Sequence, residues 1–214
     1  MTTKAPKDLA AIVAEYERKV EVFPDNAGVW HHLALAYRQS GRVDDAARAL
    51  GKALELEPNS ADSLVNLGGV LFEQGRIEEA IVVNQRALAL NPNLAQAHAN
   101  LGLIWQQRGE AEQAIAAYRE AARHAPGMAS TWVNLAVACI MAGDLDQALE
   151  AARQGVALDP DFGMAHNNLA AALYFKEDYQ AAKTHLDRAL ALGYPVPDQF
   201  RQALDQALAR PAQG

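Results

Sequence analysis

The sequence predicts an all-α protein, an α-solenoid in which one pair of helices is repeated along the chain. Three observations support this fold class. Prolines recur every 34 residues, a leucine occupies the same place in every interval, and a glycine falls near the middle of most intervals. A fixed period of this length indicates one helix-turn-helix unit stacked on itself. The recurring prolines are Pro58, Pro92, Pro126 and Pro160.

Five repeats follow from this period, and we place them at 27–60, 61–94, 95–128, 129–162 and 163–196. The seventh position is always leucine, and the eighth and twentieth positions are always glycine or alanine. Small residues at two such positions allow two helix backbones to approach closely. The seventh positions are Leu33, Leu67, Leu101, Leu135 and Leu169; the eighth are Ala34, Gly68, Gly102, Ala136 and Ala170; the twentieth are Ala46, Ala80, Ala114, Ala148 and Ala182.

The helix boundaries recur with the same period. Glycine stands where each first helix must end, except in the fifth repeat, which has Glu177 there. Acidic residues follow, where the N-terminus of the second helix favours negative charge. In four of these turns a polar residue follows the proline and is the predicted N-cap of the next first helix. The glycines are Gly41, Gly75, Gly109 and Gly143, and the predicted N-caps are Asp25, Asn59, Asn93 and Asp161.

Both flanks are predicted to be end pieces of one continuous domain. Residues 7–23 form a helix that matches a second helix without its first, and residues 1–6 are a flexible N-terminus. Residues 197–210 form a capping helix that begins at Asp198. Solenoids need atypical terminal repeats. Self-association through these end helices is an alternative role for them.

The composition excludes several classes of protein. The net charge of −7 argues against a nucleic-acid-binding protein, which normally has a basic face. No apolar segment is long enough for membrane insertion, and the first residues lack the apolar core of a secretory signal. Cys139 is the single cysteine, so no internal disulfide can form. We therefore expect a cytoplasmic protein.

These residues resemble the tetratricopeptide repeat (TPR) family, whose pattern over 34 residues runs tryptophan, Leu-Gly, tyrosine, alanine, phenylalanine, proline. The first repeat matches best, with Trp30, Leu33, Tyr37, Ala46 and Pro58. The resemblance covers about residues 27–196. It implies a right-handed superhelix of twelve helices, caps included. It also implies a concave groove that is lined by positions 2, 5, 6, 9, 12 and 13 of each first helix and binds other proteins.

Position six of the predicted groove is an asparagine in four repeats. Each amide offers a donor and an acceptor to the backbone of an extended partner segment. Asparagine is common here throughout the family, so packing alone is the alternative explanation. The position-six residues are His32, Asn66, Asn100, Asn134 and Asn168.

The other groove positions are mostly apolar and suit an extended or helical partner segment with apolar anchors. Of 30 groove positions, only Asp62, Arg38 and Glu73 are charged. Coverage of this surface by neighbouring helices, a tail or a second copy is the alternative. The predicted apolar contacts include Phe72, Leu103, Val137, Ile140, Tyr174 and Phe175, with Val65, Val133 and Met141 beside them; Arg38 is the predicted charged contact.

One known use of the TPR fold is excluded by its residues. The class that grips the C-terminal carboxylate of chaperone tails has lysine, asparagine, asparagine, lysine and arginine at successive positions. Cationic donors are needed to hold a carboxylate. Because only Asn66 matches, we do not expect chaperone tails to bind. This chain has His31, Leu35, Asn66, Gln96 and Asn100 there.

No motif for chemistry is present. The histidines have no i, i+4 pairing for a metal, and His98 and His166 occupy the tryptophan position as packing residues. Cys139 stands in a buried tyrosine position. We expect no catalysis, no cofactor and no metal. The sequence predicts a protein-protein interaction module: an adaptor, an assembly factor or a targeting chaperone. A self-assembling scaffold or a non-catalytic subunit of an enzyme complex is the alternative.

Overall fold

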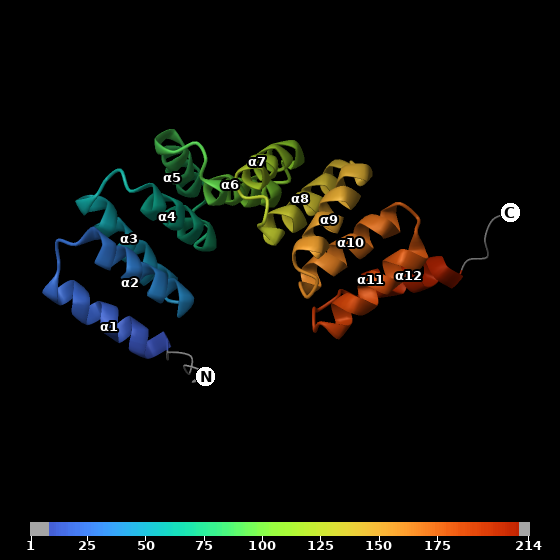
Figure 1. The fold of residues 1–214 in the computed structure, drawn as a ribbon, viewed down its shortest axis with the longest axis horizontal. Helices are drawn as coiled ribbons and strands as arrows, with labels where there is room; N and C mark the ends of the chain where they lie inside the picture. The colour runs from blue at the N-terminus through green and yellow to red at the C-terminus, as the bar shows by residue number, and fades with distance from the viewer. Residues whose placement is uncertain (1–8, 210–214) are drawn as a thin grey trace. The chain divides into compact units, whose positions relative to one another are not determined.

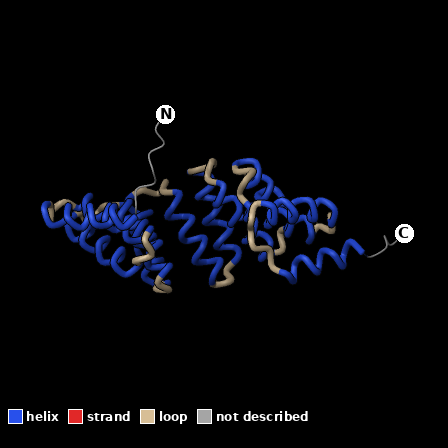
Figure 2. The backbone as a smooth tube through the Cα atoms, turned by 90° about the horizontal axis from the view of Figure 1, so that it is seen from below, coloured by secondary structure: helices blue, strands red, loops and turns tan. Residues whose placement is uncertain are grey.

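The computed structural model describes residues 9–209, and within them it contains twelve α-helices and no β-strand (Figure 2). The predicted all-α solenoid of helix pairs is therefore confirmed. No described helix combines the length and the apolar character that crossing a membrane requires. The helices are α1 (Leu9–Val22), α2 (Ala27–Gln39), α3 (Val43–Leu56), α4 (Ala61–Glu73), α5 (Ile77–Leu90), α6 (Ala95–Gln107), α7 (Ala111–His124), α8 (Ala129–Ala142), α9 (Leu145–Leu158), α10 (Gly163–Phe175), α11 (Tyr179–Ala191) and α12 (Asp198–Ala209).

The chain divides into two compact units between Ile104 and Trp105. In the first unit, each helix from α1 to α5 packs against the next one. In the second unit, each helix from α7 to α12 does the same, and α8 also packs against α10 (Figure 1). The first helices of the five repeats are α2, α4, α6, α8 and α10, so α8 and α10 are neighbouring first helices. The predicted flexible N-terminus (1–6), the first two residues of the predicted helix 7–23 and the last residue of the predicted capping helix 197–210 lie outside the described part of the chain.

Small residues bring the helices of a pair together, as the repeat pattern predicts. Ala34 and Ala46 are buried against Leu33 and Leu50 in the core of the first repeat. The second repeat differs, because Gly68 makes room for the side chain of Asn84 on α5. A Cβ atom at Gly68 would lie 2.1 Å from Asn84 Nδ2. The absence of a side chain is therefore required there.

The turn between the two helices of a repeat needs a left-handed residue. Gly41, Gly75, Gly109 and Gly143 all have φ between 73° and 78°. Glycine adopts this conformation at no steric cost. The fifth repeat keeps the same turn with Glu177, whose φ is 62°. The backbone conformation is thus conserved within the chain even where the glycine is not.

The predicted N-caps of the first helices were wrong by one residue. Asn26 caps α2 by accepting a hydrogen bond from Val29 N, and Ser60 caps α4 through Ser63 N. Phe162 takes this place at α10 and has no side-chain acceptor. Asp161, the predicted cap there, instead forms an ion pair with Arg188, with 2.7 Å between Oδ1 and Nη2. The residue directly after the proline is still in the turn, so its side chain cannot reach the helix N-terminus.

The fourth position of the repeat has a role that extends beyond packing. In four of the five repeats this residue is a tryptophan or histidine, and its ring nitrogen bonds to the carbonyl oxygen of the proline six residues earlier; the second repeat has Leu64 there instead. Such a bond satisfies a backbone acceptor that the helix end leaves free. It joins Trp30 Nε1 to Pro24 O (2.7 Å), His98 Nε2 to Pro92 O (2.9 Å), Trp132 Nε1 to Pro126 O (2.8 Å) and His166 Nε2 to Pro160 O (3.0 Å).

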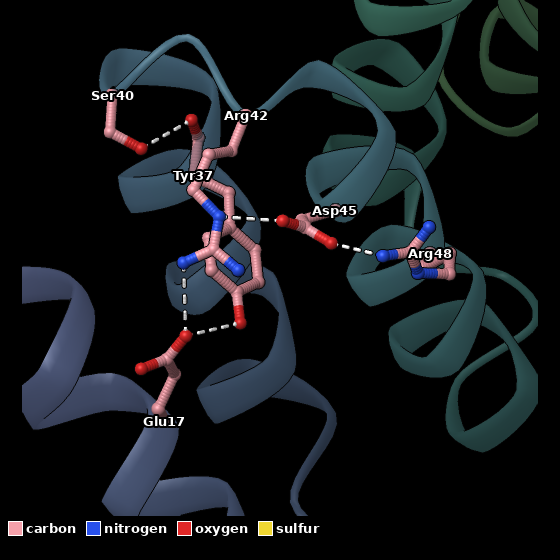
Figure 3. Close-up of polar contacts among 6 residues, drawn as sticks. All are labelled: Glu17, Tyr37, Ser40, Arg42, Asp45 and Arg48. Carbon is pink, nitrogen blue, oxygen red and sulfur yellow. Dashed lines mark hydrogen bonds and ion pairs between the residues drawn. The ribbon is translucent and has the colours of Figure 1, made fainter.

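A polar cluster attaches α1 to the first repeat (Figure 3). Glu17 Oε1 accepts hydrogen bonds from Tyr37 Oη at 2.8 Å and from Arg42 Nη1 at 3.1 Å. Arg42 lies over the Tyr37 ring and also donates to Asp45 at 2.6 Å. Burial and the bond to Glu17 raise the pKa of Tyr37, so its hydroxyl remains a donor. At the other end, α12 places Phe200 edge-on against Tyr174 of α10.

Candidate functional site

The groove positions of the first unit carry an ion pair. Arg38 on α2 donates through Nε and Nη2 to Glu73 Oε1 on α4, at 2.9 and 2.6 Å. The guanidinium lies against Gly69, where an added Cβ would be 3.1 Å from Nη2. Two of the three charges that the sequence assigns to this groove therefore neutralise each other, and Asp62 is the third. Both side chains are more than a third exposed, so the pair contributes little to stability.

Polar side chains also gather at the N-terminal ends of α2 and α4. His31 Nδ1 lies 2.9 Å from the hydroxyl of Ser63, which also accepts a hydrogen bond from Ser60. These groups border a cavity of about 340 Å³ together with His32 and Asp62. Burial, followed by the charge of neighbouring His32, lowers the pKa of His31. His31 is therefore a neutral hydrogen-bonding group at neutral pH.

The groove positions of the second unit carry no charged residue, and five of them form an apolar group. Val137, Ile140 and Met141 lie on α8, and Tyr174 and Phe175 lie on α10. Met141 is 45% exposed and Phe175 is 52% exposed, although both side chains are large and apolar. The Phe175 ring packs edge-on against Tyr174 at 5.6 Å between centroids. No charged side chain stands among these five residues.

The asparagines of position six fall into two classes. Asn100 and Asn168 are buried, and their Nδ2 atoms donate to backbone carbonyl oxygens of the preceding first helix, Val65 O and Val133 O. Asn100 also donates to Asn84 Oδ1 at 3.1 Å. Their amide donors are thus used within the stack. Asn66 and Asn134 are half-buried; Asn66 donates to Asp62 O in its own helix.

Two sequence profiles described as tetratricopeptide repeat match this chain, over residues 31–95 and 106–173. The chain belongs to the TPR family. Solved structures share the fold. A chain of the Cut9–Hcn1 hetero-tetramer of the APC/C aligns with a TM-score of 0.84 and 23% identity, covering 94% of this protein and 40% of that chain. YrrB, described as a TPR protein with an unusual peptide-binding site, aligns with a TM-score of 0.66 and 18% identity, covering 92% of this protein and all of YrrB.

A curated relative matches over a short stretch. The CTR9 homolog of Arabidopsis thaliana is 34% identical over 64 residues, which are 30% of this TPR protein and 6% of the relative. The TPR protein thus spans a small part of that relative and less than half of the Cut9–Hcn1 chain. These similarities establish the fold and a protein-protein interaction module, and they leave the partner to be argued from the site itself.

The remaining predicted site residues of this TPR protein are distributed over both units. His32 on α2 is exposed, and its ring stacks on Tyr16 of α1 at 5.6 Å. Phe72 on α4 and Leu103 on α6 are half-buried and belong to the first unit. Within each unit the structure places predicted residues on neighbouring first helices, α2 with α4 and α8 with α10. The single thiol, Cys139, is fully buried, and burial raises its pKa to about 11. It is therefore protonated and unreactive at neutral pH.

One polar cluster of the TPR protein was not predicted from the sequence. His166 on α10 and His185 on α11 lie with their Nδ1 atoms 3.0 Å apart. The residues are 19 positions apart, so no local spacing rule reveals the pair. The 34-residue alignment places His185 on the second helix of the fifth repeat, beside the position-four residue. That placement was the signal in the sequence from which the histidine pair could have been predicted.

Proposed function

We propose that this protein binds a segment of a partner protein with apolar anchor side chains and that the second unit provides the main contact surface. The surface, here called the apolar groove face, consists of Asn134, Val137, Ile140, Met141, Tyr174 and Phe175. The protein would act without catalysis as a cytoplasmic adaptor, assembly factor or targeting chaperone. Its free, buried cysteine is compatible with a reducing compartment.

The exposure of Met141 and Phe175 is the observation that supports this function most strongly. Two large apolar side chains on neighbouring first helices are each about half exposed, and none of the groove positions on these two helices is charged. Contiguous exposed apolar surface on a soluble protein marks an interaction site. Methionine and aromatic side chains are also enriched in the centres of protein interfaces. A neutral partner segment would bury this surface without leaving a charge unpaired.

The asparagines support a narrower role than the one predicted from the sequence. The side-chain amides of Asn100 and Asn168 already donate hydrogen bonds to the preceding first helix. We therefore propose Asn66 and Asn134 as the amides that orient the partner. The side-chain amide of Asn134 makes no hydrogen bond with another residue of the described chain, 9–209. It stands one turn before Val137 on the apolar groove face. An amide there can bind both the N–H and the carbonyl of an extended segment.

The structural neighbours are compatible with this proposal. YrrB is described as having a peptide-binding site, and the Cut9–Hcn1 chain is part of a protein assembly. Both share the repeat architecture with this chain. A preformed array of packed helices loses little conformational entropy when a segment binds. Segment binding therefore suits the scaffold, and the side chains of each family member determine which segment fits.

The test is capture of partners from the source lysate with the double variant Met141→Glu, Phe175→Glu. Both side chains are exposed, so folding should be unchanged, while two carboxylates on the apolar groove face should weaken binding by at least about 2 kcal/mol, roughly 30-fold. Val82→Glu is the matched control, because Val82 is 62% exposed on α5, a second helix of the first unit. Mass spectrometry identifies the retained proteins, and the purified partner then gives a dissociation constant.

The proposal predicts a protein that is retained by wild type and by Val82→Glu and lost from the double variant. Retention of the same proteins by all three would contradict it. The mass of the complex in solution separates a foreign partner from a second copy of the chain.

A further inference from the structure

The histidine pair between α10 and α11 has a defined arrangement of protons. Pro160 O can only accept, so His166 Nε2 carries the hydrogen of their 3.0 Å bond. In the neutral ring, His166 Nδ1 is then an acceptor. It lies 3.0 Å from His185 Nδ1, so that atom carries the donated hydrogen. The neutral His185 therefore has an unprotonated Nε2 with a free lone pair.

His185 borders a cavity of about 330 Å³ between α9, α10 and α11. The walls are mostly aliphatic, and two charged side chains complete them. Apolar walls with a few convergent polar groups are typical of a small-molecule or side-chain site. The lining residues are Arg153, Val156, Ala157, Leu169, Leu173, Asp178, Ala181 and His185.

The charges around this cavity balance only while His185 is neutral. The guanidinium of Arg153 on α9 forms no hydrogen bond or ion pair with any residue of the described range 9–209. Asp178 is engaged as the N-cap of α11, where Oδ1 accepts from Ala181 N at 3.2 Å. Arg188 on α11 is paired with Asp161. The lining thus sums to zero with a neutral His185 and to +1 when that ring takes up a proton.

We propose that this cavity binds a carboxylate with a short aliphatic body and that binding is coupled to uptake of one proton by His185. The proton adds to Nε2 and makes that atom a donor. Nδ1–H continues to donate to His166, so the pair keeps its bond. Arg153 supplies the permanent charge, and Val156, Leu169 and Leu173 contact the aliphatic body. The carboxylate comes from a free short-chain acid or from the C-terminus of a peptide.

The coupling works in both directions. Burial, followed by the neighbouring His166 and Arg153, lowers the pKa of His185, so the ring is neutral at pH 7. A bound carboxylate favours the imidazolium and raises that pKa. By linkage, a lower pH strengthens carboxylate binding by the same factor. Groups from all three packed elements enter this balance: Arg153 on α9, His166 on α10 and Asp178 at the N-cap of α11.

The preceding repeat offers a matched control. Arg119 holds the same repeat position as Arg153 and borders a cavity of about 410 Å³ beside Leu135. Ala151 holds the position of His185 there. That cavity has cationic groups and an apolar wall but lacks an imidazole. We therefore expect no proton-coupled carboxylate binding there.

The test uses the full chain and follows the histidine ring signals by NMR during titration with butyrate at constant ionic strength. The His185 pKa should rise by at least half a unit at saturation, and butyrate should bind several-fold more tightly at pH 5.5 than at pH 7.5. Arg153→Gln should weaken binding at least fivefold at both pH values, whereas Arg119→Gln should have no effect. His185→Gln should abolish the pH dependence.

Two further ligands distinguish the sources of the carboxylate. A tetrapeptide with a free C-terminal carboxylate and the same peptide with an amidated C-terminus are titrated in parallel. Binding of butyrate supports a free acid as ligand, and binding of the carboxylate peptide alone supports a peptide C-terminus. The proposal is overturned if neither ligand shifts the His185 signals, or if Arg153→Gln and Arg119→Gln weaken binding equally. Unchanged helicity of each variant by circular dichroism excludes unfolding as the cause.

Discussion

The same two repeat positions hold opposite chemistry in the two units. Position 12 of one repeat and position 13 of the next are Arg38 and Glu73 in the first unit, joined by two hydrogen bonds. In the second unit the corresponding residues are Ile140 and Phe175, which are apolar. The helices that carry them have the same lengths to within one residue. The backbone repeats, whereas the surface that it presents does not.

The comparison teaches that repeat position alone does not determine function. The ninth position also differs between the two units. Gly69 leaves room for the Arg38 guanidinium in the first unit, and the corresponding residue in the second unit is Ala171. The same helix-pair fold therefore carries a surface with an ion pair in the first unit and a half-exposed apolar surface in the second unit. A partner segment can be selected by side chains that cost the fold little, because they lie outside the packed seam.

We expect the largest change in stability from a substitution that breaks the buried hydrogen-bond network of Asn84 in the first unit. Gly68→Ala places a Cβ atom on the amide of Asn84, which then loses its bonds to Ala80 O and Asn100. Steric overlap and an unsatisfied buried amide together should lower the free energy of unfolding by about 3 kcal/mol. Urea denaturation measures the change.

The matched control for this change is Ala136→Gly, at the same repeat position in the second unit. It should cost only about 1 kcal/mol, mainly through backbone entropy. If Gly68→Ala cost no more than this control, Asn84 would not depend on the glycine.

A transplant of the ion pair should convert one surface into the other. The triple variant Ile140→Arg, Ala171→Gly, Phe175→Glu reproduces the first unit's arrangement on α8 and α10. We expect partner binding to weaken by about 2 kcal/mol, since the apolar anchors lose their contacts and two charges must be desolvated. The measurement is calorimetric titration with the purified partner. Unchanged affinity would show that the partner binds elsewhere.

Substitution of a buried asparagine should mainly lower stability, whereas substitution of a half-buried one should mainly weaken partner binding. Asn100→Ala removes the buried hydrogen bonds to Val65 O and Asn84 Oδ1 and should lower the unfolding free energy by about 2 kcal/mol. Asn134→Ala should change stability by less than about 0.5 kcal/mol and weaken partner binding instead. Paired denaturation and binding measurements test this. Equal stability losses would mean that both amides serve the stack.

The smallest effect concerns pH and involves one histidine in each unit. The pKa values of His31 and His185 are lowered, mainly by burial, so the folded protein favours their neutral forms. Their stabilising effect is complete above the unfolded pKa of about 6.5 and is lost as pH falls through the lower folded pKa. The urea midpoint should therefore fall between pH 7 and pH 5. His31→Gln and His185→Gln should each flatten this dependence, and a midpoint that rises on acidification would contradict the assigned signs.

The repeat pattern predicted most of the fold because each recurring residue has a local reason. Leucine at position seven fills the seam, small residues allow close approach, and glycine adopts a positive φ. The N-caps were misplaced by one residue because chemical type alone does not locate the first helical turn after a proline. Glu177 adopts the left-handed turn without being glycine, so the turn of the repeat holds a conformation that the residue itself disfavours.

The site was harder to predict because it depends on distances between helices. Sequence alone placed Asn100 and Asn134 at the same position, yet only one amide reaches a carbonyl oxygen of the preceding first helix and a buried asparagine. The pair of His166 and His185 likewise depends on how α10 and α11 pack. The apolar positions on α8 and α10 could be predicted, since the resemblance to the TPR family identifies the groove positions, but their exposure could not.

The most direct test of the central claim places a photo-crosslinking amino acid at the same repeat position in both units. Position 13 is Gln39 in the first repeat and Met141 in the fourth, and both side chains are exposed. Each variant is irradiated with the captured partner, and the crosslinked products are counted by mass spectrometry. If the apolar groove face binds the partner, crosslinks form at position 141 and are rare at position 39. Equal crosslinking at both positions, or crosslinking at position 39 alone, would contradict the account.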